Sequence, residues 1–124
     1  MKLFDATLST LEKALDVRLV RQNVLASNLA NANTPGFQPQ DVDFARSLEA
    51  VQAQSTAGEG SLPAEQAVVT VPMPGASPGL DGNGVDADRT MVALAQNALQ
   101  YGAAARAAGK KLAILRYVVT DGNG

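Results

Sequence analysis

The placement of proline constrains the fold of this 124-residue chain more than any other feature. All six prolines lie between residues 35 and 78, so both ends of the chain are free of proline. Because proline lacks a backbone N–H and clashes with the preceding helical turn, a long helix can form only outside this region. The sequence therefore predicts three parts: an N-terminal helical segment (1–33), an irregular linker (34–85) and a C-terminal helical segment (86–124).

The N-terminal segment has the periodicity of a helix from about residue 3 to residue 32. Its main apolar positions advance by three or four, which places them along one face of that helix. A second apolar row, Val17, Val20 and Val24, flanks the first. The helix would be roughly 45 Å long and needs partners on more than one side. The first row consists of Leu8, Leu11, Leu15, Leu19, Gln22, Ala26 and Leu29.

The C-terminal segment is more regular, since apolar or small residues alternate in steps of three and four over four heptads. This is the spacing of a coiled-coil seam. Asp86 or Asp88 is expected to cap the start of the helix. The sequence therefore predicts a mainly α-helical chain, in which two long terminal helices form a coiled-coil-like hairpin joined by an extended, largely irregular middle segment. The seam consists of Met91, Leu94, Ala98, Tyr101, Ala105, Ala108, Leu112, Leu115 and Val119.

The middle of the chain has the composition of an extended segment. Residues 57–84 are rich in glycine, proline and serine, which favours irregular structure. One apolar run, 67–71, could form a strand, and Pro72 and Pro74 would confine it to a sheet edge. More than 50 residues without firm structure argue against a compact domain.

Two helices alone cannot bury several apolar faces, and a thin core without disulfides is marginal. Residues 101–111 are almost all alanine and glycine apart from a few basic groups, which allows close approach of other backbones on several sides. We therefore expect these helices to pack among many copies of other helices. The alternative is a flexible, alanine-rich helix in a small bundle.

The residue types present exclude most chemistry. The chain has no cysteine and no histidine, which removes disulfides, thiolates and the commonest general base and metal ligand. A net charge of −2 gives no general attraction for nucleic acid, and no apolar run approaches the ~18 residues of a membrane span. Asp5 and Glu12 interrupt the apolar core that a secretory signal needs. We expect no catalysis, no cofactor or metal, no nucleic-acid partner, no direct membrane insertion and no cleaved signal.

Two acidic clusters are candidates for a catalytic or a calcium-binding site. Asp41 and Asp43 could form a carboxylate pair for acid–base catalysis, but no histidine, cysteine or phosphate-binding loop accompanies them. Residues 81–88 suggest a calcium loop, but Asp86 and Val92 stand where an EF-hand needs glycine and glutamate. Turn formation explains the Asp-Gly and Asn-Gly pairs of this segment better.

The first predicted helix ends in LASNLANANTPGF (25–37), with three asparagines where helix formers would be expected. Asparagine tolerates the left-handed conformation that closes a helix, so Asn33 is expected near the C-cap, with Pro35 preventing continuation. Asn28 and Asn31 lie three residues apart on one face. Their amides can both donate and accept hydrogen bonds, and such groups set the register between neighbouring chains.

Two motifs resemble a known family. The motif at 25–37 is similar to the N-terminal signature of the axial proteins of the bacterial flagellum, the rod and hook family. DGNGVDADRTM (81–91) is similar to that family's C-terminal signature, and the segment QPQDVDF (38–44) resembles the proximal rod members. The resemblance covers both ends of the chain and leaves the middle uncovered.

The resemblance implies a structural, non-enzymatic subunit of the proximal rod, which assembles helically into the drive shaft that transmits motor torque. Its implied partners are copies of itself, other rod and basal-body proteins, proteins at the junction of rod and MS ring, and the flagellar type III export apparatus. The implied location is the periplasmic rod of the basal body, reached without signal cleavage. A small coiled-coil adaptor or chaperone-like binding module, which would form a small defined oligomer, is the alternative.

On this interpretation the subunit interface includes both apolar rows and the exit from the first helix. Residues 34–37 would turn the chain out of the helical layer, with Gly36 supplying the backbone angle. Phe37 would pack on an adjacent helix. The expected interface residues are Leu8, Leu11, Leu15, Leu25, Asn28, Leu29, Asn31, Asn33, Pro35, Gly36, Phe37, Met91, Leu94, Ala98, Tyr101, Ala105, Ala108, Leu112, Leu115 and Val119.

Overall fold

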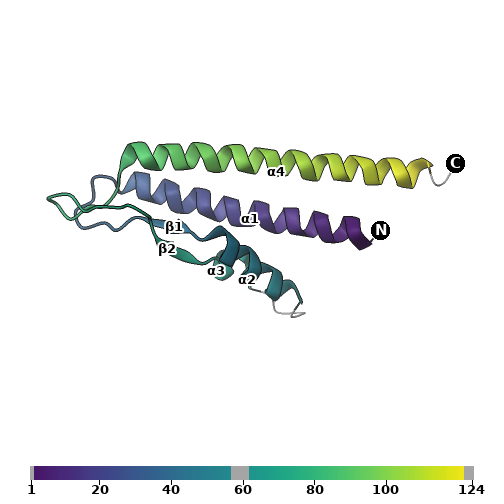
Figure 1. Ribbon diagram of the computed structural model, residues 1–124, viewed down its shortest axis with the longest axis horizontal. Helices are drawn as coiled ribbons and strands as arrows, with labels where there is room; N and C mark the ends of the chain where they lie inside the picture. The colour runs from purple at the N-terminus through teal and green to yellow at the C-terminus, as the bar shows by residue number, and fades with distance from the viewer. Residues whose placement is uncertain (1, 57–61, 122–124) are drawn as a thin grey trace.

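A computed structural model describes residues 2–56 and 62–121 of the chain. Two long helices, one towards each end of the chain, run antiparallel beside each other (Figure 1), which confirms the predicted mainly α-helical hairpin. Residues 57–61 of the expected linker and 122–124 of the expected C-terminal segment lie outside the described residues. The elements are α1 (Lys2–Ala30), β1 (Gln40–Val42), α2 (Phe44–Thr56), α3 (Ala64–Ala67), β2 (Thr70–Pro72) and α4 (Ala87–Asp121).

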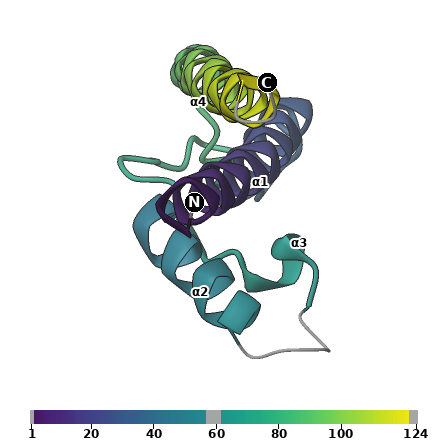
Figure 2. The same ribbon diagram turned by 90° about the vertical axis from the view of Figure 1, so that its right-hand side faces the viewer.

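The elements pack in three layers with α1 in the middle. α4 lies along one side of α1, and α2 and α3 lie on the other side (Figure 2). This central position explains the two apolar rows of the N-terminal sequence, because α1 must bury two faces. Val17 and Leu25 are fully buried, whereas Leu19 of the first row is 53% exposed. The half-buried leucines of that row are Leu8, Leu11, Leu15 and Leu29.

The middle of the chain is more regular than the sequence analysis expected. α2 is a helix of 13 residues within the segment expected to be irregular, and that part of the expectation is wrong. The Asp43 carboxylate caps α2 by accepting the backbone N–H of Arg46 at 3.1 Å. Ser47 and Val51, four residues apart on α2, are buried. Short helices depend on tertiary packing for their stability, and this one packs on α1.

β1 and β2 form a two-stranded antiparallel sheet. The strand expected over 67–71 is present but starts only at Thr70, because Ala67 still belongs to α3. Pro72 ends the strand, where its missing N–H leaves no gap inside a longer ladder. The register pairs Gln40 with Pro72, Asp41 with Val71 and Val42 with Thr70.

The apolar core is small. Its buried centre is formed by Val17 of α1, Val42 of β1 and Val51 of α2. Polar side chains are buried beside it: the Ser47 hydroxyl accepts the Val69 N–H at 2.9 Å and so ties α2 to the chain before β2. The fully buried side chains include Leu25, Val17, Asn28, Asn97, Thr90, Pro39 and Ser47. Hydrogen-bonded polar groups therefore carry much of the packing between layers.

The row of α4 residues that packs on α1 differs from the predicted seam, because every second position of the row lies one residue earlier in the sequence. Met91 and Leu112 belong to the predicted seam, yet they are 57% and 53% exposed. The buried side chains of α4 are those of Thr90 and Asn97. None of the described helices is both long enough and apolar enough to cross a membrane. The buried or half-buried row of α4 includes Thr90, Leu94, Asn97, Ala104, Ala108, Lys111 and Leu115.

Candidate assembly surface

The two sequence motifs meet at one end of the hairpin, where Asn83 closes α1. The last carbonyl groups of a helix have no intrahelical donor. The Nδ2 group of Asn83 donates to the carbonyl oxygens of Asn31, Ala32 and Thr34 at 2.9, 3.0 and 2.7 Å. Its Oδ1 atom accepts the Val85 N–H at 2.7 Å. The second motif therefore holds the turn that follows α1, at the end of the first motif.

The chain leaves α1 through a tight turn. The Phe37 N–H bonds the Thr34 carbonyl at 3.2 Å, and Gly36 has a φ of +75°. With Pro35 before the glycine, this is the pattern of a type II turn, and it confirms that position 36 needs glycine. Gly82, with a φ of +74°, packs on this turn, since a Cβ atom there would lie 3.4 Å from the Gly36 Cα atom.

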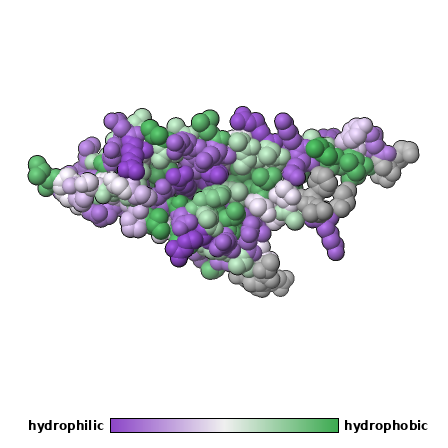
Figure 3. All heavy atoms as spheres, viewed as in Figure 1, coloured by the Kyte–Doolittle hydropathy of each residue, from purple (hydrophilic) through white to green (hydrophobic). Residues whose placement is uncertain are grey.

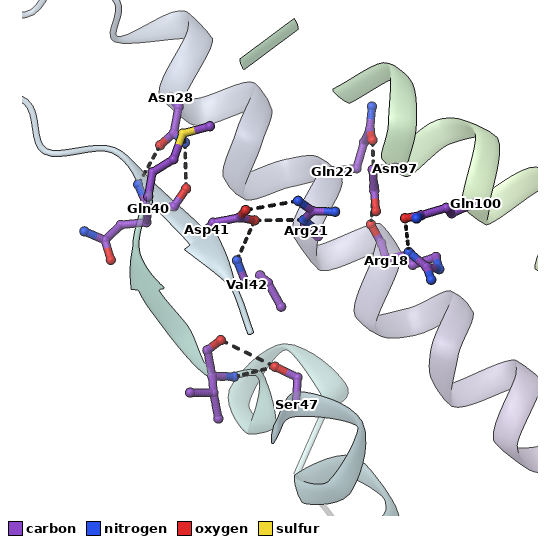
Figure 4. A network of polar contacts seen from close by, with 12 residues as sticks. Arg18, Arg21, Gln22, Asn28, Gln40, Asp41, Val42, Ser47, Asn97 and Gln100 are labelled. Atoms are coloured by element: carbon purple, nitrogen blue, oxygen red, sulfur yellow. Dashed lines mark hydrogen bonds and ion pairs between the residues drawn. The ribbon is translucent and has the colours of Figure 1, made fainter. Parts of the chain in front are cut away.

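Asn28 is used inside the subunit. Its side chain is 1% exposed and pairs with the backbone of Gln40. The Nδ2 group donates to the Gln40 carbonyl at 2.6 Å, and Oδ1 accepts the Gln40 N–H at 3.0 Å (Figure 4). This pairing holds β1 against α1. The role of Asn28 in register between subunits stays a prediction, and the amide reaches a neighbour only if its contact with β1 opens.

The other two asparagines of the motif are more accessible. The Asn31 Nδ2 group donates to the Ser27 carbonyl at 2.8 Å and remains half-buried. Asn33 is exposed, lies three residues beyond the last residue of α1, Ala30, and does not have a positive φ. The expected left-handed closure at Asn33 is therefore wrong. The cap comes instead from Asn83, 50 or so positions along the chain, as its contacts with residues 31–34 demonstrate.

Polar side chains hold α4 onto α1 (Figure 4). The Asn97 Nδ2 group donates to the Arg18 carbonyl and to Gln22 Oε1, both at 2.8 Å, while the buried Oδ1 atom of Asn97 has no protein partner. Arg18 donates to Gln100 Oε1 at 2.6 Å, and its guanidinium group lies 4.3 Å from the centre of the Phe44 ring. Burial, followed by the charge of a neighbouring arginine, lowers the pKa of Arg18. Arg18 thus touches all three layers.

A two-pronged ion pair joins α1 to β1. Arg21 Nε lies 2.8 Å from Asp41 Oδ1, and Arg21 Nη2 lies 3.0 Å from Asp41 Oδ2. Asp41 Oδ1 also accepts the Val42 N–H at 2.7 Å. The hydrogen bond to Asp41 raises the pKa of Arg21, although burial opposes this. Asp41 and Asp43, the two candidates for an acid–base pair, therefore have structural roles. Asp41 pairs with Arg21, and Asp43 caps α2.

Residues 81–88, the candidate calcium loop, form turns. Asp81 Oδ1 accepts the Asn83 N–H at 3.1 Å, and the Gly82 N–H bonds the Gly79 carbonyl at 2.9 Å. Asp86 Oδ1 accepts the Arg89 N–H at 3.0 Å, which confirms Asp86 as the N-cap of α4. Within residues 2–56 and 62–121, acidic side chains form no group of three or more that could hold a metal ion.

α4 carries most of the exposed apolar surface. Of the twelve large apolar side chains exposed among the described residues, nine belong to α4, and hydrophobic atoms appear along the edge of the molecule where this helix lies (Figure 3). Exposure on this scale marks an interaction surface. The nine residues are Met91, Val92, Leu99, Tyr101, Leu112, Ile114, Tyr117, Val118 and Val119.

Comparison with known proteins identifies the family of this chain. Residues 8–38 match the family model described as flagella basal body rod protein. The chain is 35% identical to the flagellar basal body rod protein FlgB of Salmonella typhimurium over 96% of each protein. It belongs to the FlgB family of flagellar basal body rod proteins. The corresponding protein of Escherichia coli is 36% identical over 96% of each chain. That of Yersinia enterocolitica is 40% identical over 78% of this chain and 81% of its own length.

Membership in this family makes the chain a structural, non-enzymatic subunit of the flagellar proximal rod, as the motifs at its two ends implied. The adaptor alternative receives no support from these relatives. The match over residues 8–38 spans most of α1 and the turn that follows it. The chemistry of the rod subunit is therefore association, and its functional residues are those that form the hairpin and those that the hairpin leaves uncovered.

The structure divides the expected interface residues into three groups. Leu25 and Asn28 are buried inside the rod subunit. The half-buried group consists of Leu8, Leu11, Leu15, Leu29, Asn31, Phe37, Leu94, Ala105, Ala108 and Leu115. The exposed group consists of Asn33, Pro35, Gly36, Met91, Ala98, Tyr101, Leu112 and Val119.

Sequence reasoning missed three residues that hold the hairpin together, Asn83, Asn97 and Arg18. One signal was available for Asn83, because an asparagine between two glycines at 82 and 84 indicates a tight, specific backbone path. For Asn97 the signal was an amide three residues after Leu94 in a heptad-spaced helix, which is typical of a buried register-setting position.

Proposed function

We propose that this rod subunit builds the rod through the outer face of α4, which packs against helices of neighbouring rod subunits while the inner face of α4 holds α1. The observation that carries the proposal is the exposure of one heptad position of the predicted seam: Met91, Leu112 and Val119 lie whole heptads apart and are 57%, 53% and 56% exposed. A heptad-spaced apolar row is the surface that another helix fills.

Two adjacent rows give α4 two partners. The row containing Thr90 and Asn97 contacts α1 with polar and small side chains. The row containing Met91 and Leu112 lies one residue further along the helix, about 100° around its axis. Because the hairpin leaves Met91 and Leu112 of the second row more than half exposed, these side chains are available to a neighbour without unfolding the subunit. Partners of this kind are copies of this chain and other rod and basal-body proteins, including those at the junction with the MS ring.

Charge supports association of unlike regions. Residues 34–88 carry eight acidic groups and one basic group, whereas residues 89–124 carry five basic groups and one acidic group. When subunits pack side by side, the basic helix of one subunit can face the acidic middle of the next. Complementary charge of this kind steers association and suppresses wrong orientations. Export through the flagellar type III apparatus to the periplasm is part of the same proposal.

The test is a charge placed in the outer row. Leu112→Asp should leave the hairpin folded, because the Leu112 side chain is 53% exposed. It should stop rod assembly, because burial of an unpaired carboxylate at a subunit contact costs several kcal/mol. Exported protein and completed rods would be measured in the same cells. Ala103→Asp, an exposed position on the helix face of Gln96 and Lys110, is the matched control and should build rods. Normal rods from Leu112→Asp would refute the proposal.

A further inference from the structure

A pocket of about 330 Å³ opens between α1, β1, the segment that follows β2 and the start of α4. Met73 and Pro74 line one side of it, and Val92 of α4 lines another. Met73 is buried, whereas Val92 is 58% exposed at the rim. The pocket is therefore open to a side chain of another protein, and the charges inside it determine which kind of side chain fits.

Two arginines and one aspartate line this pocket. Arg21 uses its Nε and Nη2 groups to bind both carboxylate oxygens of Asp41 (Figure 4), so these two charges balance each other. The guanidinium group of the other arginine, Arg89, pairs with no acidic side chain within residues 2–56 and 62–121. The pocket therefore contains one positive charge in excess.

Gly75 makes room for the Arg89 guanidinium group. A Cβ atom at position 75 would lie 3.0 Å from Arg89 Cζ and closer still to Nη1, so a larger residue would displace the group. The φ of +75° at Gly75 favours glycine as well. The guanidinium group is thus positioned against backbone at the pocket, without an opposite charge of its own subunit.

We propose that this pocket binds a glutamate side chain from the α2–α3 layer of a neighbouring copy that packs beside the subunit. The donors of a free guanidinium group match the two oxygens of a carboxylate. α2 and α3 lie on the side of α1 opposite α4 (Figure 2), so copies placed side by side can bring this layer of one copy against α4 of the next. Each of the two helices has one acidic residue, and both are exposed: Glu49 in α2 and Glu65 in α3.

The pocket and the outer row lie on different flanks of α4. Arg89 precedes the buried Thr90 and Met91 follows it, so their side chains point about 100° to either side of the buried row. A subunit can therefore contact one neighbour through each flank, and such unlike patches form rings or helical assemblies. The proposal rests on the proposed function, since it adds a second lateral contact to the same assembly.

Charge reversal of Arg89 in the full chain tests the pocket. Arg89→Glu should leave the purified chain folded, with thermal unfolding near the wild-type temperature, because the side chain is exposed and has no ion pair to lose. In cells it should lower the number of completed rods about tenfold or more, because two carboxylates would meet in the pocket. Arg106→Glu makes the same change in net charge at an exposed position of α4 outside the pocket, and it should build rods as the wild type does.

Charge exchange identifies the partner. Arg89→Glu combined with Glu49→Arg or with Glu65→Arg should restore rods several-fold over Arg89→Glu alone, and a photoreactive residue in place of Val92 should cross-link to α2 or α3 of another copy. Normal rods from Arg89→Glu would overturn the proposal, as would failure of both exchanges or cross-linking to a different rod protein alone. If Leu112→Asp stops assembly while Arg89→Glu builds rods, the outer row keeps its role and only the pocket contact is lost.

Discussion

α1 and α4 are proline-free helices of 29 and 35 residues with similar apolar periodicity, yet they behave oppositely in the subunit. α1 lies between two layers, and its fully buried side chains include Val17 and Leu25. α4 contacts the subunit on one side, and its buried side chains are Thr90 and Asn97. The helix that organises the subunit buries Val17 and Leu25 together with the polar Asn28, whereas the helix on the outside buries only polar side chains among its described residues and leaves most of its large apolar ones exposed.

This difference teaches how to interpret periodicity in a chain that works as a subunit. In a protein that folds alone, an apolar seam indicates the intramolecular interface, because exposed apolar surface has no other partner. In a rod subunit the best apolar seam can be reserved for other chains, and the intramolecular contact can rest on hydrogen bonds and small residues.

The largest effect is expected from Val17→Asp. Val17 is fully buried in the apolar core. A carboxylate at this position would be buried without a partner, which costs several kcal/mol. We expect loss of the cooperative helical transition in thermal unfolding followed by circular dichroism. Leu19→Asp is the control, since Leu19 is 53% exposed on the same helix, and it should unfold near the wild-type temperature. If both variants unfold alike, α1 does not organise the subunit.

Asn83→Ala should have the next largest effect. It removes the donor from three carbonyl groups of the turn that follows α1 and the acceptor from the Val85 N–H. Leaving buried backbone groups without partners costs about 1–3 kcal/mol each where water cannot replace them, and we expect a loss of about 3 kcal/mol in unfolding free energy. Denaturant titration measures this loss, together with faster amide exchange at 29–36. Asn33→Ala, at an exposed position, should change stability by less than ~0.5 kcal/mol. Equal losses from the two variants would contradict the cap.

Asn28→Ala should destabilise the monomer by about 2 kcal/mol, because it strands the N–H and carbonyl groups of Gln40. Asn31→Ala removes two local bonds that water can replace, one to the Ser27 carbonyl and one from the Thr34 hydroxyl, and should cost about 1 kcal/mol or less. Impaired assembly of a variant that carries both Asn28→Ala and Asn31→Ala would therefore combine a folding defect with an interface defect. Asn31→Ala alone, scored for export and for rods, tests whether the amides set register between subunits. Normal rods from this variant would leave Asn31 as part of a helix end only.

How much the sequence could predict follows from the range of each interaction. The long helices, the cap at Asp86 and the glycine turn at position 36 depend on neighbouring residues, so periodicity and turn chemistry predicted them. The rotation of α4 depends on the contact of Asn97 with α1, 75 to 79 positions away, and local spacing carries no information about it. α2 was missed although Phe44, Leu48 and Val51 have helical spacing, because a helix of 13 residues is marginal by itself and depends on its packing on α1.

Among the substitutions of buried side chains, Asn97→Leu is expected to change stability least, and it tests the comparison of the two helices most directly. The substitution loses two hydrogen bonds, to the Arg18 carbonyl and to Gln22, worth about 0.5–1.5 kcal/mol each. It also removes the buried Oδ1 atom that has no protein partner, a gain of about 1–3 kcal/mol. These effects nearly cancel, so the unfolding free energy should stay within ~1 kcal/mol of wild type.

What Asn97→Leu should change is register, because a buried amide fixes the relative position of two helices at some cost in stability. Leu19 and Ala98 line one cavity between α1 and α4, so a Leu19→Cys, Ala98→Cys pair reports native register by an intramolecular disulfide. Leu19→Cys with Ala105→Cys reports a slip of one heptad, roughly 10.5 Å. With Asn97 present, only the pair at positions 19 and 98 should form a disulfide. With leucine at position 97, the pair at positions 19 and 105 should also form one. If the leucine variant keeps full selectivity for the first pair, the polar row of α4 is incidental, and small residues alone hold the hairpin in place.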